Sequence, residues 1–317
     1  MAPLNVLFCS TFENTRDACR QEAVRYLLQR ALRPRPLACR VDVPLGRNPS
    51  QELARGHKFD VLKESEDGGD FPLIVATGAV DLKSKRLDTR AGQYATSCWL
   101  FIGIDLPPDI DIQIDSKAFL VLSKALVICR ERTGSEALER VGIKSQILPC
   151  PALFACEWEA PSRQLGMIAV VVDESVSTED NKLASVIHST SELIQQLRRC
   201  YNVVLVRGNL DAFSKSCRGV LMQCDAVVVN DVSVALLANS FLKPAILPMF
   251  NREPPVVLPS GFSPFIYSVQ QSHIVRFLGA MNIESVGRAM LNWKRLVEAE
   301  YIRVLQSQLS RYGFDPL

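Results

Sequence analysis

The stretch from residue 224 to residue 247 limits the possible folds of this chain more than any other. It reads CDAVVVNDVSVALLANSFLKPAIL, in which 226–229 is a short apolar run made mostly of valine. Such a run predicts a strand that is buried on both faces, as in a parallel sheet. Residues 232–241 have the pattern of a helix, and 245–247 start another strand. We therefore expect a strand–helix–strand unit here.

The turn between that strand and that helix carries polar side chains. Asp231 is a good helix N-cap, and Lys243-Pro244 ends the helix because the residue before a proline avoids the α region. In open α/β sheets, ligands bind beyond the carboxyl ends of the strands, where the N–H groups of a helix start favour an anion. Asn230, Asp231 and Ser233 are therefore candidate donor-binding residues. An ordinary crossover without a ligand explains the same local sequence.

The rest of the chain repeats this alternation of strands and helices. Before Pro149 we expect strands at 5–9, 37–43, 71–76, 98–104, 125–129 and 143–148, and helices at 16–32, 51–54, 114–123 and 134–141. After Gly166 we expect strands at 167–172 and 202–206, helices at 180–199 and 211–218, and a proline-rich loop at 251–263. Residues 149–166 contain three prolines and no periodicity, which is typical of a linker. Apolar residues spaced by three or four between Val286 and Val304 predict a long closing helix.

These elements predict an α/β fold of two Rossmann-like, doubly wound parallel-sheet domains that face a cleft. We expect an acceptor-side domain at 1–148, a linker at 149–166, a donor-side domain at 167–284 and a C-terminal helix at 285–317. A length of 317 residues fits two domains better than one. The whole arrangement is the plan of GT-B transferases, in which the active site lies in the inter-domain cleft.

Composition narrows the class of protein. With 48% hydrophobic and 22% charged residues, the chain is globular rather than disordered. A net charge of +2 without a run of basic residues argues against a dedicated nucleic-acid binder. No apolar run approaches the roughly 18 residues that span a bilayer, and the N-terminus lacks the basic start of a signal peptide. Ten cysteines without a C-x-x-C pair, and only three histidines, predict free thiols, no zinc site and a cytoplasmic protein.

Loops that follow the predicted strands should line the cleft. Asn14, Gly78 and Asp105 are the expected cleft-lining residues of the first domain. Asp17 is the candidate catalytic base for an acceptor hydroxyl. A carboxylate at a helix start is also stabilised by the helix dipole without any function. Ser135 is expected to cap its helix rather than to contact a ligand.

Arginines form a second group of candidates. Arg130, Arg132 and Arg207 follow strands and can clamp a phosphate or carboxylate bidentately, so we expect them to bind the donor. The alternative for the first two is a surface pair with Glu131 or Glu136. For Arg207 the alternative is a simple turn.

The sequence does not favour a metal centre. Asp109 and Asp111 form a D-x-D, which binds manganese in another class of glycosyltransferases. Here the pair lies in PPDIDIQID, an alternation of polar and apolar residues typical of an edge strand or a loop. We therefore expect no metal site and no required cofactor. His57, His188 and His273 lie in polar or helical contexts and are expected at the surface.

In the order and spacing of its motifs, the chain resembles the polysaccharide pyruvyl transferase family. Residues 14–17 (NTRD) resemble the family's N-x-G-D signature, with Arg16 in place of glycine. Residues 74–78 (IVATG) resemble its glycine-rich strand end, and 100–104 (LFIGI) its "G-I-G" strand. The best match is 123–154, SKALVICRERTGSEALERVGIKSQILPCPALF, which resembles the family's strand, turn, helix and "D/C-P-A" run. The resemblance implies the same two-domain architecture.

One departure bears on the donor. The family's R-L-H triplet, which the resemblance implies would bind phosphoenolpyruvate and donate a proton, falls at or next to Asn230-Asp231-Val232. Neither the arginine nor the histidine is present, so a nucleotide-sugar donor suits this position better. The leading hypothesis is a GT-B-type glycosyltransferase that moves a sugar from a nucleotide-sugar donor to an acceptor hydroxyl of a carbohydrate or another molecule. The alternatives are a pyruvyl transferase that uses phosphoenolpyruvate, and a non-catalytic descendant that binds a glycan or nucleotide.

Overall fold

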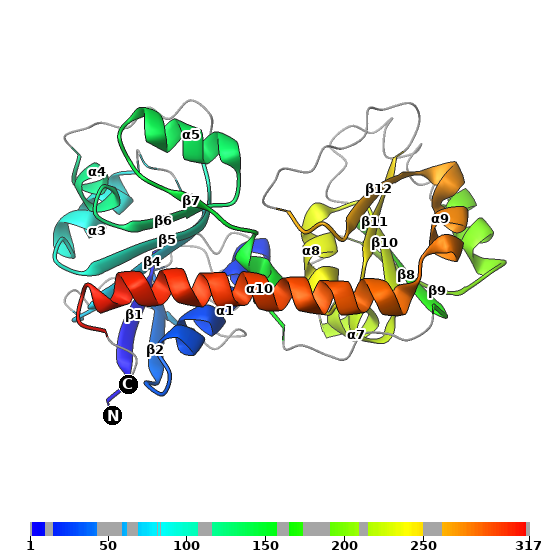
Figure 1. The fold of residues 1–317 in the computed structure, drawn as a ribbon, viewed down its shortest axis with the longest axis horizontal. Helices are drawn as coiled ribbons and strands as arrows, with labels where there is room; N and C mark the ends of the chain where they lie inside the picture. The colour runs from blue at the N-terminus through cyan, green and yellow to red at the C-terminus, as the bar shows by residue number, and fades with distance from the viewer. Residues whose placement is uncertain are drawn as a thin grey trace. The chain divides into compact units, whose positions relative to one another are not determined.

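The structure is a computed structural model that describes residues 2–9, 15–42, 59–61, 69–80, 82, 84–106, 116–156, 165–173, 191–208, 215–249 and 262–314 (Figure 1). The chain divides into two compact units. Unit 1 comprises Met1–Ala155, Pro259–Gly261 and Leu296–Leu317, and unit 2 comprises Cys156–Leu258 and Phe262–Arg295. Each unit is built on its own parallel sheet, so the predicted fold of two Rossmann-like α/β domains is confirmed.

Unit 1 contains a seven-stranded sheet in the order β3-β2-β1-β4-β5-β6-β7, with every neighbouring pair parallel. Its strands are β1 (Leu4–Phe8), β2 (Leu37–Val41), β3 (Asp60–Val61), β4 (Leu73–Ala79), β5 (Cys98–Asp105), β6 (Leu126–Cys129) and β7 (Gln146–Ile147). The chain runs outward from β1 to β3 and then returns to place β4 on the other side of β1. This reversal is the topological switch point, where ligands of doubly wound sheets bind.

Helices cover both faces of the unit 1 sheet. The helices α3 (Lys85–Gln93), α4 (Lys117–Leu122) and α5 (Arg132–Arg140) lie over one face, where Leu87, Val121 and Leu138 join a core cluster with Trp99 and Phe101 (Figure 1). Helix α1 (Thr15–Ala31) and the C-terminal part of α10 (Ile283–Ser310) lie over the other. Burial of both faces explains the nearly continuous apolar strands.

Two irregularities shape the carboxyl end of this sheet. The β4–β5 register shifts between Thr77 and Gly78, and the β5–β6 register shifts between Ile102 and Ile104. Gly103, between these two isoleucines, has a φ of 62°, and a Cβ built there would lie 2.5 Å from the Pro151 side chain. Only glycine fits such a position. Bulges of this kind bend a strand end and re-aim the side chains that follow.

Unit 2 contains a five-stranded parallel sheet in the order β12-β11-β10-β8-β9. Its strands are β8 (Met167–Asp173), β9 (Asn202–Gly208), β10 (Ala226–Val229), β11 (Ala245–Met249) and β12 (Ile266–Gln270). Helix α9 (Ile274–Ala280) and the helical residues 191–198 share a core cluster with one face. The remaining helices are α7 (Lys215–Gln223) and α8 (Val232–Ser240). The switch point of this sheet lies between β8 and β10.

Helix α10 belongs to unit 2 at its start and to unit 1 from Leu296 onward. In unit 2, the buried Lys294 donates to the carbonyl oxygen of Ser240 at 2.7 Å, at the end of α8. In unit 1, the buried Tyr301 donates its hydroxyl to the carbonyl oxygen of Pro149 at 2.7 Å. Specific buried hydrogen bonds thus fix each part of α10 to its own unit.

Several expected elements differ from those observed. The sequence reading missed α3, α9 and β12, which are short and carry weak patterns. Only Gln146–Ile147 of the strand expected at 143–148 pairs with β6. Within the stretch expected to be a linker, Pro151–Phe154 forms the buried 3-10 helix η1 in unit 1. The helix expected at 51–54 and the loop at 251–261 lie outside the described residues, as does most of the helix expected at 180–199.

Candidate functional site

Polar side chains gather where the parallel strands of unit 1 end. Cys9 follows β1, Asp42 follows β2, Asp105 ends β5 and Arg130 follows β6. The carboxyl ends of parallel strands lie at one edge of a sheet, so these four residues belong to one edge. This edge also contains the switch point between β1 and β4, which makes it the candidate site of unit 1.

Asp105 lies between two arginines. Its Oδ2 is 3.1 Å from Nη2 of Arg20, on α1, and its Oδ1 is 2.8 Å from Nη2 of Arg130. Nη2 of Arg130 also contacts Oε1 of Glu131 at 3.2 Å. The side chains of Arg20 and Arg130 are only 4% and 13% exposed, whereas that of Asp105 is 26% exposed. Two guanidinium groups therefore face two carboxylates, and the partly exposed Asp105 can still accept a hydrogen bond from a ligand.

Asp42 forms a second ionic cluster at the same edge. Its carboxylate accepts hydrogen bonds from Arg86 at 2.6 and 3.2 Å and from Arg90 at 3.0 and 3.3 Å, both on α3. Burial on its own raises the pKa of Asp42, but the hydrogen bonds and charges of these two arginines outweigh it and hold the pKa below its ordinary value. The pKa of Arg90 is raised in turn, because hydrogen bonding to Asp42 outweighs the effect of its own burial.

The thiol of Cys9 is not suited to nucleophilic chemistry. Burial raises its pKa strongly, and the negative charge of Asp42 raises it further, while Arg90 and Arg86 lower it in part. A nucleophilic cysteine requires the thiolate, which this environment disfavours. The chemistry of this edge therefore belongs to its carboxylates and arginines.

A buried amide follows Arg20 in the sequence. Gln21 follows Arg20 on α1 and is fully buried. In the part of the chain that the structure describes, neither its Nε2 nor its Oε1 has a hydrogen-bond partner. A buried polar group without a partner costs free energy, about 1–3 kcal/mol. Such a group is unusual in a stable core and is often explained by function.

In unit 2, the turn after β10 reaches the carboxyl edge of the sheet next to the switch point. Oδ1 of Asp231 accepts from the backbone N–H of Val234 at 3.0 Å, so the predicted N-cap of α8 is confirmed. This bond satisfies one N–H group that an anion would otherwise use, and it adds a negative charge at the helix start. Asn230, directly after the strand, is partly exposed. The arrangement suits hydroxyl groups of a ribose or sugar better than a bare phosphate.

The structure describes the remaining candidate residues to different extents. Gly78 is buried at the end of β4 with a φ of 82°, and Arg132 is an exposed residue whose Nε lies 4.0 Å from Oε1 of Glu136. Asp17 lies in the first turn of α1, three and four positions before Arg20 and Gln21, the spacing of neighbours on one helix face. The following lie outside the described residues: Asn14, Asp109, Asp111 and the side chains of Asp17, Arg207 and Ser233.

One local expectation was wrong. Ser135 lies inside α5 rather than at its N-cap, which is Glu131. Its hydroxyl instead bonds to that of Ser145 at 2.8 Å and so joins α5 to the segment before β7. The helix starts two residues earlier than expected, because the residues from Arg132 to Thr133 already adopt helical backbone angles.

The sequence reading also missed four residues of this edge. Arg20 occupies the face of α1 that carries Ala23, Val24 and Leu27, and an arginine in an apolar stripe signals a buried ionic pair. Asp42 directly follows β2, but the strand expected at 37–43 contained it, so it was not recognised as a residue after a strand. Arg86 and Arg90 are spaced by one helical turn on α3, a helix that was not expected.

Among the described residues, no group of three or more His, Cys, Asp or Glu side chains is arranged to hold a metal ion. A search of the same residues finds no helix with the length and hydropathy needed to cross a membrane. The nine cysteines whose side chains the structure describes are free thiols.

Comparison of the sequence with protein-family models gives no match, and comparison with curated proteins gives none either. The resemblance to polysaccharide pyruvyl transferases therefore stays a prediction. Comparison of the fold with solved structures does give matches. A UDP-N-acetylglucosamine 2-epimerase is similar over 100% of this chain and 98% of its own, with 11% identity and a TM-score of 0.54. This likeness is one of fold, and it confirms the predicted GT-B-like class.

Two further solved structures show weaker likeness. The UDP-GlcNAc 2-epimerase from Neisseria meningitidis bound to UDP-GlcNAc covers 97% of this chain and 100% of its own, with 10% identity and a TM-score of 0.49. The E. coli heptosyltransferase WaaC with ADP covers 87% of this chain and 99% of its own, with 14% identity and a TM-score of 0.47.

Proposed function

We propose that this protein binds a nucleotide sugar and transfers the sugar to an acceptor hydroxyl, as a GT-B-type glycosyltransferase. The observation that carries the proposal is the whole-chain likeness in fold to a UDP-N-acetylglucosamine 2-epimerase, whose name specifies a nucleotide sugar. The polar turns at the switch points of the two sheets support it. The free thiols support a reducing compartment such as the cytoplasm.

Unit 2 takes the donor in this proposal. Beyond β10, Asn230 donates and accepts hydrogen bonds with ribose or sugar hydroxyls, and Asp231 accepts hydrogen bonds from them. Ser233 and the backbone of the α8 start, together with Arg207 near the end of β9, hold the diphosphate. A diphosphate spreads its charge over several oxygens, so it tolerates the capping carboxylate better than a compact, highly charged donor does.

Unit 1 takes the acceptor. Because Arg20 and Arg130 are balanced by Asp105 and Glu131, this cluster offers hydrogen bonds without a large excess of positive charge. That suits an uncharged polyol better than phosphoenolpyruvate, which needs cationic partners. The amide of Gln21 adds a further hydrogen-bonding group on α1.

The reaction needs a base near the acceptor hydroxyl. We assign this role to Asp17, in the first turn of α1, which would remove the proton as the acceptor oxygen attacks the anomeric carbon. The bond from that carbon to the diphosphate breaks, and the nucleoside diphosphate leaves. Arg130 acts in this proposal by holding Asp105 at the end of β5, and Arg132 contacts only the solvent-facing groups of a ligand.

A ligand panel tests the donor. We expect nucleoside diphosphates and nucleotide sugars to raise the unfolding temperature of the full chain, and phosphoenolpyruvate to have little effect. A ligand at one hundred times its Kd stabilises the folded state by about 2.7 kcal/mol. Asn230→Ala should reduce this shift, whereas Gln223→Ala, at an exposed site on α7, should not.

Each outcome of the panel has a clear reading. A shift in unfolding temperature with phosphoenolpyruvate alone would favour the pyruvyl transferase alternative. No shift with any ligand at millimolar concentration would contradict the proposal that the protein binds a nucleotide sugar. Proton NMR can detect conversion of a nucleotide sugar to its epimer. Such conversion would support nucleotide-sugar binding, but it would show that the reaction is epimerisation rather than sugar transfer. A strictly manganese-dependent shift would point to Asp109 and Asp111.

A further inference from the structure

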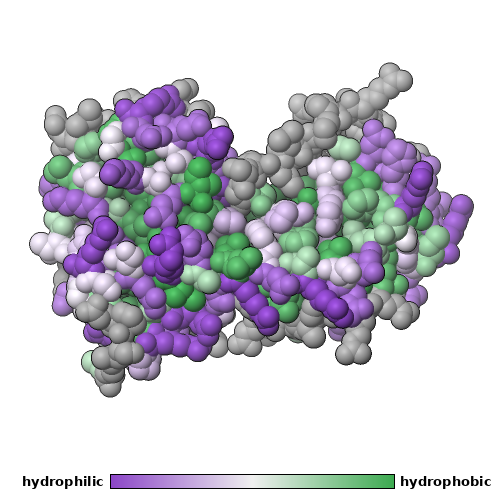
Figure 2. Space-filling model, in the orientation of Figure 1, coloured by the Kyte–Doolittle hydropathy of each residue, from purple (hydrophilic) through white to green (hydrophobic). Residues whose placement is uncertain are grey.

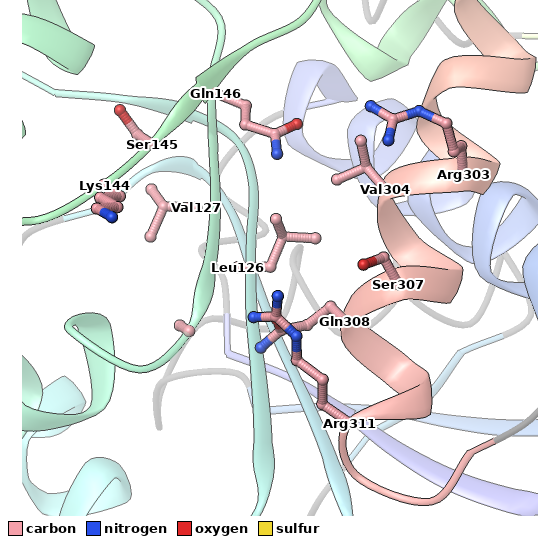
Figure 3. Close-up of a pocket in the computed structure, with 11 residues that line it drawn as sticks. Leu126, Val127, Lys144, Ser145, Gln146, Arg303, Val304, Ser307, Gln308 and Arg311 are labelled. Carbon is pink, nitrogen blue, oxygen red and sulfur yellow. The ribbon is translucent and has the colours of Figure 1, made fainter.

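A small pocket lies in unit 1 at the opposite edge of the sheet from the candidate site. It is bounded by the amino end of β6, the segment that leads into β7, and the last turns of α10 (Figure 3). Its volume is about 190 Å³. Since the pocket lies entirely within unit 1, its description does not depend on how the two units are arranged.

The pocket has basic and polar walls. Lys144 comes from the segment before β7, and Arg303 and Arg311 come from α10 and the turn that follows it. Figure 3 shows both arginines on the α10 side and Gln146 reaching toward them from β7. None of the described residues that line the pocket is acidic. Hydrophilic residues also gather over the C-terminal part of α10 in the surface view of Figure 2.

The three cations differ in their partners. Arg303 is bonded to Glu300, one turn earlier on α10, through both Nε and Nη2. Among the described residues, no carboxylate forms an ion pair with Lys144 or with Arg311. Two positive charges therefore line the pocket without a carboxylate partner among the described residues. This differs from the carboxyl edge of the same sheet, where Arg20 and Arg130 share Asp105.

The polar groups of the pocket are already partly positioned. Gln308 is 7% exposed, and its Nε2 donates to the carbonyl oxygen of Lys124 at 3.4 Å, which joins α10 to the turn before β6. Ser307 adds a hydroxyl group from α10, whereas the hydroxyl of Ser145 is already bonded to Ser135. Arginine, lysine and hydroxyl groups in one concave space are the partners that a phosphoryl group recruits.

The size of the pocket limits the ligand. At about 30 Å³ for each water in the liquid, its volume is that of roughly six water molecules. This is below the 300–1,000 Å³ that is common for sites of drug-sized ligands, according to surveys of pockets. This volume is closer to the size of a single phosphoryl group than to that of a whole nucleotide.

We propose that this pocket binds a phosphate dianion, either free inorganic phosphate or the phosphoryl group of a small monoester. The bound anion connects Lys144 beside β7 with Arg311 at the end of α10, and thereby fastens the last turns of α10 to unit 1. The pocket and its ligand are separate from the candidate donor and acceptor sites, so this proposal does not rest on the proposed function.

Isothermal titration with inorganic phosphate, at constant ionic strength in sodium chloride, tests the binding in the full chain. We expect saturable binding to the parent protein and at least a tenfold weaker Kd for Lys144→Gln/Arg311→Gln. The matched control is Lys117→Gln/Arg140→Gln, which removes two charges from exposed positions of α4 and α5 in the same unit. Its affinity should equal that of the parent.

Hydrogen exchange gives a second readout. Phosphate should slow exchange of backbone amides in residues 300–310 of the parent, but not in the double variant, and should leave 283–294 unchanged. Glycerol 3-phosphate in place of phosphate distinguishes the sources: equal binding means that a monoester can supply the group, and binding of phosphate alone means that the ligand is the free ion. Either result supports the phosphate site.

Three results would overturn the proposal. The first is no saturable binding of phosphate at millimolar concentration. The second is equal affinity in the parent and the Lys144→Gln/Arg311→Gln variant, since the ion would then bind elsewhere. The third is equal affinity for chloride and phosphate, because the pocket would then only screen charge.

Discussion

Replacement of Asp42 by asparagine tests the ionic clusters at the carboxyl edge of unit 1. Asparagine keeps the shape of the side chain but removes the negative charge that Arg86 and Arg90 share. Both arginines then face an amide whose nitrogen is a donor, so at least one of the four hydrogen bonds is lost. The arginines stay where α3 places them, and their charges lose the partner that offset their burial.

The structure sets the expected magnitude. Asp42 is 5% exposed and Arg90 is 12% exposed, so this pair belongs to the buried class, in which removal of one partner costs about 3–5 kcal/mol. Arg86 is 37% exposed and is largely solvated, so the loss of its ion pair with Asp42 should lower the unfolding free energy by less than about 1 kcal/mol. We expect a total loss of about 3 kcal/mol. In a domain of 150–250 residues this lowers the unfolding temperature by about 6–12 °C.

The loss should depend on pH in a defined direction. The pKa of Asp42 lies below its ordinary value of 3.8, so its contribution is fully present above that value and disappears as the pH falls through the lower pKa of the folded state. The difference in unfolding free energy between the parent and Asp42→Asn should therefore be constant from about pH 5 upward and should shrink toward zero in stronger acid. Other carboxylates affect both proteins equally and cancel in this difference.

Urea unfolding at a series of pH values measures this difference, with a probe of unit 1 such as the fluorescence of Trp99. The matched control is Asp60→Asn, at an exposed position of β3, which should cost less than about 0.5 kcal/mol. A loss below 1 kcal/mol in the Asp42 variant, or a loss that is the same at pH 3 and pH 7, would show that the cluster does not stabilise unit 1 through charge.

Three further predictions follow from the packing. Tyr301→Phe removes the buried hydroxyl that donates to the carbonyl of Pro149 and should cost about 1–3 kcal/mol in urea unfolding, whereas Tyr312→Phe, at an exposed position, should cost little. Gly103→Ala should lower the yield of folded protein, or lower its stability by more than about 2 kcal/mol, since the new Cβ meets Pro151 and φ is positive. Equal stability of the variant and the parent would contradict the backbone conformation described at this bulge. Among the described thiols, Cys200 should react first with a maleimide, and Cys200→Ser should remove that fast phase in mass spectra.

The strands were predictable because both sheets are parallel and covered on both faces. Such strands are short apolar runs, and 226–229 was located to the residue. Helix α8 was located through its two ends, the N-cap Asp231 and the break at Lys243-Pro244. These features are local in sequence, so a reading of one segment at a time suffices to find them.

Ionic partners are not local in sequence. Arg20 and Asp105 are brought together only when α1 packs beside the sheet, and Asp42 meets Arg90 only through α3. Asp105 and Arg130 were identified as candidates from their positions at strand ends, but Asp42 and the partners of these residues were not. For the same reason, the sequence predicted that Arg130 binds a donor but not that its guanidinium contacts Asp105 at 2.8 Å. Gly103 was noted only as part of a motif, whereas the need for glycine there comes from the side chain of Pro151, 48 positions later in the chain.

The two edges of the unit 1 sheet show that the partners of an arginine decide what it can bind. At the carboxyl edge, Arg20 and Arg130 hold Asp105, so an incoming anion would have to displace a carboxylate that is already in place. At the amino edge, Arg311 and Lys144 have no carboxylate partner among the described residues, so an anion meets no such competitor. The position of its residues after the strands favours the carboxyl edge as a ligand site, while the unbalanced positive charge favours the amino edge as an anion site. Both criteria are satisfied if the carboxyl edge binds hydroxyl groups and the amino edge binds phosphate.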